Sequence, residues 1–141
     1  MPNLLSHKLH GLTLALDRLA EIEVQNKYSI SYTEFLILLS LKCEPNASQK
    51  YIAQFTNLSK GLISRQVFNL NQKQLLKIKK TKTDRRQDIV NLTTTGNKLV
   101  GESSKHLEEL FLGYTKSGIT QDELLNFEKT LDKLLKNIYE K

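Results

Sequence analysis

Two short amphipathic segments separated by two residues make up the pattern SQKYIAQFTNLSKGLISRQVFNL at residues 48–70. Ser48 is placed to cap a helix over Gln49–Thr56, and Ser59 to cap a second over Lys60–Leu70, because a serine hydroxyl accepts from the free N–H groups of a first turn. The apolar residues of the second helix fall on one face: Leu62, Ile63, Val67 and Leu70. The pattern predicts a helix-turn-helix whose second helix is polar on its outer side.

Amphipathic helices are predicted on both sides of this unit. The stretch Ser31-Tyr-Thr-Glu34 has the form of a capping box, which predicts a buried helix over Tyr32–Cys43. The capping box Thr120-Gln-Asp-Glu123 predicts a last helix. An earlier helix, ending near Asn26–Tyr28, carries leucines at three- and four-residue spacing: Leu5, Leu9, Leu12, Leu16 and Leu19. The last helix carries a similar stripe: Leu124, Phe127, Leu131, Leu134, Leu135 and Ile138.

A β-hairpin is predicted after the helix-turn-helix. Leu76–Lys80 and Ile89–Leu92 alternate apolar and polar residues, and TKTDRRQ separates them. Thr93 is placed to cap a long following helix with Gly96 in its first turn. The fold class is therefore mainly α with a small β-hairpin wing, in which a winged helix-turn-helix unit is flanked by N- and C-terminal helices.

Length and composition indicate one domain. The chain has 141 residues, of which 39% are apolar, enough for one core. No apolar run is long enough to span a membrane, and charged residues interrupt the apolar pattern of the N-terminus, which argues against a signal peptide. We expect a cytoplasmic protein with no membrane partner, and the single cysteine, Cys43, suits a reducing compartment.

The net charge of +6 is concentrated in the middle of the chain. Residues 45–100 hold eleven basic and two acidic residues, and no acidic residue lies between Pro45 and Thr83. Clustered lysine and arginine gain by releasing the counterions condensed on a nucleic acid, so this distribution favours a phosphate-binding segment. A solvated basic face is the alternative interpretation.

The stretch Asp84-x-Arg86-x5-Leu92-Thr93-x-x-Gly96 resembles the wing signature of MarR-type winged helix-turn-helix transcription regulators. The resemblance extends over essentially the whole chain, as a single domain over 1–141. It implies a winged helix-turn-helix lobe at about 30–95 and dimerisation helices at about 1–27 and 96–141. In two places the chain departs from the family. Gln74 stands where a glycine is usual, which predicts a positive φ or an altered turn, and Phe68 stands where a charged residue is common.

The resemblance implies a sequence-specific homodimer that binds double-stranded DNA at a pseudo-palindromic operator, represses transcription, and is released by a small ligand or an oxidant. The leucine stripes support a dimer independently, because they are more apolar than the core of a lone helix-turn-helix requires. Packing of the two termini within one chain is the alternative. The residues expected at the interface are Leu5, Leu9, Leu12, Leu124, Phe127, Leu131 and Leu134.

The DNA-contacting residues are expected on the second helix of the helix-turn-helix and on the wing. A helix in the major groove meets base edges through its N-terminal half, and arginine can address guanine with two hydrogen bonds. On the helix these residues are Ser59, Lys60, Ser64 and Arg65, of which Ser59 also serves as the cap. On the wing they are Lys80, Lys82, Arg85 and Arg86, with Lys77 and Lys79 on the same basic hairpin.

Asp84 is expected to brace the wing. An acid that faced phosphate would weaken binding, so we expect Asp84 to pair with Arg86 and to leave Arg85 for the minor groove. The reverse assignment, with Arg86 in the groove, stays open.

A pocket for a small apolar or aromatic effector is expected near Tyr32, Phe35 and Phe111.

Cys43 is expected to be a buried structural thiol and not an oxidant sensor. No metal site is expected, since the spacing of His7 and His10, with His106 elsewhere, is a weak pattern. No cofactor is expected either, and no nucleophile and base are paired as an enzyme would need. The rival interpretations are a winged protein-interaction module or a small-molecule-binding protein with no DNA target.

Overall fold

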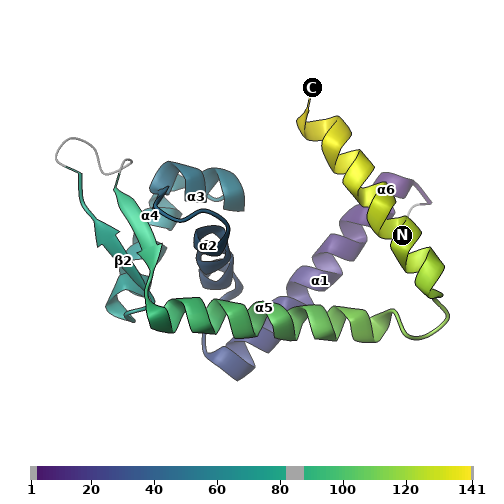
Figure 1. The fold of residues 1–141 in the computed structure, drawn as a ribbon, viewed down its shortest axis with the longest axis horizontal. Coiled ribbons are helices and arrows are strands. Elements are labelled where there is room, and N and C mark those ends of the chain that lie inside the picture. Colours follow the sequence, from purple (N-terminus) through teal and green to yellow (C-terminus); the bar gives the residue numbers. More distant parts are fainter. Residues whose placement is uncertain (1–2, 82–87, 141) are drawn as a thin grey trace. The chain divides into compact units, whose positions relative to one another are not determined.

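The computed structural model describes residues 3–81 and 88–140 (Figure 1). The predicted fold class is confirmed: in the described residues six helices accompany one small antiparallel sheet. The chain divides after Leu107 into two units, Met1–Leu107 and Glu108–Lys141. In chain order the elements are α1 (Leu5–Tyr28), α2 (Tyr32–Cys43), β1 (Ala47–Ser48), α3 (Gln49–Thr56), α4 (Lys60–Gln72), β2 (Leu76–Lys79), β3 (Ile89–Leu92), α5 (Thr94–Tyr114) and α6 (Gln121–Tyr139).

Side-chain caps start the helices where the sequence predicts them. The Ser31 hydroxyl accepts from the Glu34 backbone N–H at 3.0 Å, while a Glu34 carboxylate oxygen accepts from the Ser31 N–H at 3.0 Å. Thr120 and Glu123 form the same reciprocal box at the start of α6. Such boxes satisfy N–H groups that no helical carbonyl reaches, and this explains why the two helix starts are locally encoded.

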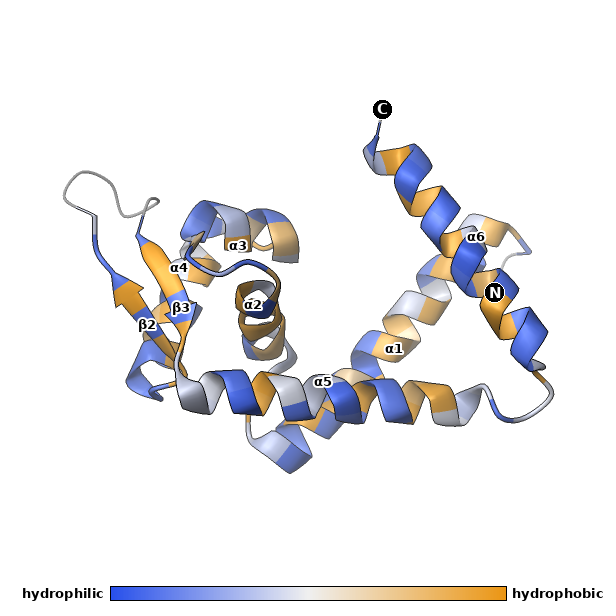
Figure 2. Cartoon of the chain, in the orientation of Figure 1, coloured by the Kyte–Doolittle hydropathy of each residue, from blue (hydrophilic) through white to orange (hydrophobic). Residues whose placement is uncertain are grey.

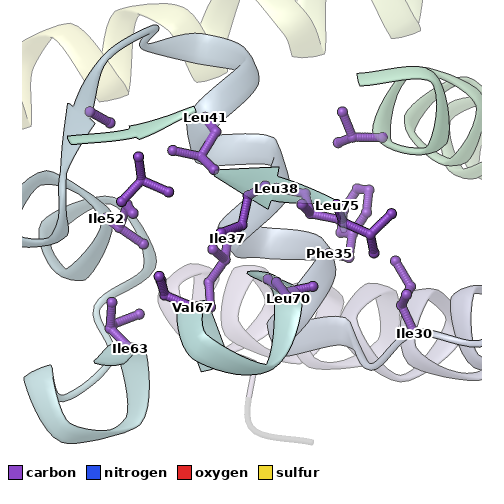
Figure 3. Close-up of a cluster of buried hydrophobic side chains, with 14 of the residues drawn as sticks. Ile30, Phe35, Ile37, Leu38, Leu41, Ile52, Ile63, Val67, Leu70 and Leu75 are labelled. Carbon is purple, nitrogen blue, oxygen red and sulfur yellow. The ribbon is translucent and has the colours of Figure 1, made fainter. Parts of the chain in front are cut away.

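The core of the first unit is built around α2. Figure 2 shows α2 as strongly hydrophobic, and Figure 3 shows its Ile37 and Leu38 among side chains of α3, α4 and the segment after α4. Ile37 and Leu38 are fully buried, as α2 touches α1, α3, α4 and β3. Their fully buried neighbours in the cluster include Ile52, Ile63, Val67, Leu70, Val90 and Val100. The predicted burial of this helix is confirmed.

The sheet has the strand order β1-β3-β2, and β1 is absent from the sequence-based prediction. Ala47 pairs with Val90, and Ser48 with Ile89. The residue before the strand, Asn46, has a φ of 59° and exchanges two hydrogen bonds with the Asn91 side chain, both 2.8 Å long. A strand of two residues shows no alternation, so only this long-range pairing reveals it.

A turn between α4 and β2 explains the threonine and glycine of the wing signature. Gln74 has a φ of 60°, as its place at a glycine position predicts, at a cost of about 1 kcal/mol. The Thr93 hydroxyl donates to the Gln74 carbonyl at 2.7 Å and accepts from the Gly96 N–H at 3.0 Å. A Cβ on Gly96 would overlap the Leu75 carbonyl oxygen. The start of α5 is thus held directly on the turn that ends the helix-turn-helix.

In the second unit, most of the large apolar residues of α6 are exposed. None of the residues of α6 is buried, although the helix is strongly amphipathic (Figure 2). The exposed large apolar residues of α6 are Leu125, Phe127, Leu134, Leu135, Ile138 and Tyr139. A helix with this pattern needs another apolar surface to be stable in water.

Candidate nucleic-acid interface

Three local features position α4, the second helix of the helix-turn-helix. Asn57 takes the left-handed conformation with a φ of 56°, which ends α3 and turns the chain sharply. The Ser59 hydroxyl accepts from the Leu62 N–H at 3.2 Å, so the predicted cap is confirmed. Ile63 and Val67 are fully buried against the core. These anchors fix which face of α4 is left for solvent.

The outer face of α4 lines a hollow of about 480 Å³ together with the base of the wing. Gly61, Ser64, Arg65 and Phe68 follow the spacing of one helix face, and all four border this hollow. Its other walls are formed by residues of α3 and the hairpin: Gln49, Ile78, Lys80 and Asp88. The structure therefore brings the predicted Ser64, Arg65 and Lys80 together around one concave surface. Predicted Lys60 is exposed at the start of α4 and borders a smaller hollow with Gln49 and Lys50.

The strand alternation divides the lysines of the wing between two faces. Leu76 is buried and Ile78 half-buried, whereas Lys77 and Lys79 between them are exposed. Because side chains alternate along a strand, Lys77 and Lys79 lie on the face opposite Ile78. Among the wing lysines that the structure describes, Lys80 borders the hollow together with residues of α4. The predicted wing residues Lys82, Asp84, Arg85 and Arg86 lie outside the described residues, so their roles stay predictions.

Asp88 anchors the base of the wing, a role that the sequence analysis did not assign. Its side chain is only 4% exposed, and one carboxylate oxygen accepts from the Thr81 backbone N–H at 2.9 Å. The same oxygen lies 3.4 Å from the Thr81 hydroxyl. The available signal was an acid directly before a strand in a basic segment. Asp84 was the more conspicuous acid because it belongs to the resemblance.

Glu34 fixes the other end of α4. Besides capping α2, its second carboxylate oxygen accepts from Lys73 Nζ at 2.8 Å. Lys73 is the C-terminal cap of α4, and Glu34 is 7% exposed. A nearly buried carboxylate with both oxygens in hydrogen bonds joins the two helices rigidly. The orientation of α4 is therefore set at both of its ends.

Tyr32 and Phe35, two residues predicted for an effector pocket, lie side by side at the start of α2. Their rings stack with centroids 6.0 Å apart, and Phe35 is buried. The Tyr32 hydroxyl donates to an Asp17 carboxylate oxygen of α1 at 2.9 Å. The third predicted residue, Phe111, belongs to the second unit and is half-buried. The pocket thus stays a prediction.

Stability at high pH should depend on Tyr32. Burial, and then the hydrogen bond to Asp17 and its charge, raise the pKa of the Tyr32 phenol. A folded pKa above the unfolded value of about 10 stabilises the protein below that pH, and the contribution is lost as the pH rises further. The advantage of the wild type over Tyr32→Phe in melting temperature should therefore shrink above pH ~10. Thermal unfolding followed by circular dichroism from pH 7 to 11 tests this. The control is Tyr139→Phe, and a constant difference between wild type and Tyr32→Phe would contradict the prediction.

The predicted burial of Cys43 is wrong, because its side chain is exposed. It is the last residue of α2, two positions after buried Leu41, and two positions turn the side chain to the far side of a helix.

Of the histidines considered as metal ligands, His106 binds a Glu23 carboxylate oxygen through Nε2 at 2.7 Å and contacts Lys27 Nζ through Nδ1 at 3.3 Å. His7 and His10 are exposed on α1.

The residues predicted for a dimer interface differ in exposure within the single chain. Leu5, Leu12, Phe127 and Leu134 are exposed, whereas Leu9, Leu124 and Leu131 are half-buried.

No helix in the part of the chain that the structure describes is long and apolar enough to cross a membrane.

Comparison with known proteins shows similarity to the MarR family. A model of the MarR family matches residues 30–87, from just before α2 through the wing. The chain is 24% identical over 131 residues to the HTH-type transcriptional regulator MgrA of Staphylococcus aureus, covering 93% of this chain and 87% of MgrA.

Solved structures share the fold. A mutant MarR from E. coli complexed with operator DNA superposes with a TM-score of 0.72 at 22% identity, covering 93% of each chain. Staphylococcus aureus MarR in complex with salicylate and kanamycin superposes with a TM-score of 0.79 at 18% identity, covering 99% of this chain and 95% of that one. The helix-turn-helix and the wing thus match the MarR family model, and the chain shares the fold of solved MarR structures along nearly its whole length.

Proposed function

We propose that the protein is a sequence-specific DNA-binding repressor that acts as a homodimer on a pseudo-palindromic operator. The observation that carries this proposal is the single concave surface formed by the outer face of α4 and the base of the wing, with Arg65 and Lys80 on its border. A helix whose exposed N-terminal half carries Lys60 and Arg65 suits the major groove, where base edges are read.

Charge supports DNA as the partner. The stretch from Pro45 to Thr83 lacks acidic residues, so the polyanion meets no fixed negative charge there. Asp88, at the border of the same surface, is nearly buried and engaged with Thr81. The sequence predictions for the wing tip, Arg85 in the minor groove with Asp84 paired to Arg86 or the reverse with Arg86 in the groove, concern residues outside those described. A structure of E. coli MarR with operator DNA has the same fold.

Dimerisation would use the terminal helices, at about 1–27 and 96–141. The uncovered apolar residues of α1 and α6 support this, since each helix offers a stripe that a second copy could bury. Two copies related by a twofold axis would present two α4 helices to two half-sites, which accounts for a pseudo-palindromic operator. A small apolar or aromatic effector bound near Tyr32 and Phe35 would release the DNA; a solved Staphylococcus aureus MarR in complex with salicylate and kanamycin has the same fold.

Arg65→Ala should weaken binding to the preferred duplex by about 1–3 kcal/mol, because it removes two hydrogen bonds to guanine and one phosphate-neutralising charge. The preferred duplex is obtained by selection from a random library and compared with the DNA upstream of the protein's own gene. Fluorescence anisotropy at several salt concentrations gives Kd and its salt slope.

Lys105→Ala is the control, since it removes one exposed positive charge from α5, outside the basic segment. It should leave Kd nearly unchanged. The proposal would be wrong if the wild type selected no sequence, or if its affinity for duplex DNA did not depend on salt. In either case a protein-interaction module would become the better interpretation.

A further inference from the structure

Phe68 is an aromatic residue on the border of the concave surface that we propose for DNA. Its side chain is 58% exposed, although Ile63, Val67 and Leu70 of the same helix are completely buried. Phe68 follows Gly61 and Arg65 on one helix face and borders the same hollow as Ile78 and Lys80. An exposed aromatic ring gains free energy only from a partner that removes it from water.

The surroundings of the ring indicate the chemistry of that partner. Arg65 and Lys80, the cations that border the hollow, are both exposed, whereas Asp88 is nearly buried and accepts hydrogen bonds from Thr81. Ile78, half-buried, adds apolar surface beside the ring. The partner must therefore present an apolar group within a field of negative charge. Duplex DNA does so at one place in the major groove, the C5 methyl group of thymine.

We infer that Phe68 is a specificity-determining residue that contacts a thymine methyl group in each half-site. The inference rests on the proposed DNA-binding function and deepens it. Arg65 precedes Phe68 by three residues, which is about 4.5 Å along a helix, and neighbouring bases on one strand are about 3.4 Å apart. The thymine therefore lies within two base pairs of the guanine that Arg65 reads.

The test removes only the methyl group. In the preferred duplex, each thymine near the guanine is replaced in turn by deoxyuridine, which keeps base pairing and lacks the methyl. The wild type should lose about fourfold in affinity at one thymine per half-site, the effect of about one buried methyl group. Phe68→Ala should bind the thymine and uracil duplexes equally well. Phe55→Ala removes a second exposed phenylalanine, from α3, and should retain the wild-type preference.

The possible results distinguish a failure of this inference from a failure of the proposed DNA-binding function. Sequence-specific binding by the wild type that is indifferent to every methyl group near the guanine would overturn the inference alone. Retention of the full thymine preference by Phe68→Ala would do the same, provided that circular dichroism shows the variant folded. Failure of the wild type to bind any duplex specifically would overturn the proposed function, and the inference with it.

Discussion

Replacing Gly96 by alanine should destabilise the protein by more than about 3 kcal/mol. The added Cβ would overlap the carbonyl oxygen and carbon of Leu75, and these are backbone atoms that cannot rotate away as a side chain would. Relief would require α5 to move from the turn, which would break the hydrogen bonds between Thr93 and Gln74 and between the Thr93 N–H and the Leu75 carbonyl. Urea unfolding followed by circular dichroism measures the loss.

Gly101→Ala provides the matched control. Gly101 lies in the same helix, and a Cβ there would meet nothing within 4 Å. Alanine in a helix interior is favoured over glycine by about 1 kcal/mol, so this variant should be as stable as the wild type or more stable. A Gly96→Ala protein with wild-type stability would show that the close approach of α5 to the turn is not a constraint in solution.

The double variant Leu12→Glu, Leu134→Glu should be monomeric and should bind the operator at least about a hundredfold more weakly than the wild type. Both leucines are exposed in the single chain, at 41% and 40%, so the substitutions spare the core while placing four carboxylates in a symmetric interface. A monomer also loses the gain that comes from holding two α4 helices on one DNA molecule. Sedimentation velocity and anisotropy measure the two effects.

His10→Glu combined with Lys129→Glu is the control for this variant. These residues are exposed on the same two helices but lie away from the apolar stripes. The control should remain dimeric. Dimerisation through α1 and α6 would be refuted if the leucine variant stayed a dimer, or if the wild type sedimented as a monomer.

Helix boundaries were predictable because their signals are local. Ser31 with Glu34, and Thr120 with Glu123, encode their helix starts within four residues, and the structure confirms both. For Gln74 the usual glycine predicted either a positive φ or an altered turn, and the structure shows the first, with a φ of 60°. By contrast, β1 depends on pairing between residues more than forty positions apart, as in Ala47 with Val90, and no local pattern signals it.

The sequence predicted which residues belong to the candidate site better than it predicted how they are arranged. Sequence alone selected Arg65 and Lys80, but it could not show that Lys80 borders one hollow together with the outer face of α4. It also treated Phe68 only as a departure from the family pattern. Only the structure shows that Phe68 borders the same hollow as Arg65 and Lys80. Cys43 was misjudged because a helix can be buried along most of its length and still expose its last residue.

The segment 31–34 holds three helices through two side chains. Tyr32 binds Asp17 of α1, and Glu34 binds Lys73 at the end of α4, while both belong to the first turn of α2. A rotation of α1 against α2 that kept the Tyr32 contact would pull on the same turn that orients α4. Movement of α1 can therefore reach α4 by a path only one turn of helix long, through the first turn of α2.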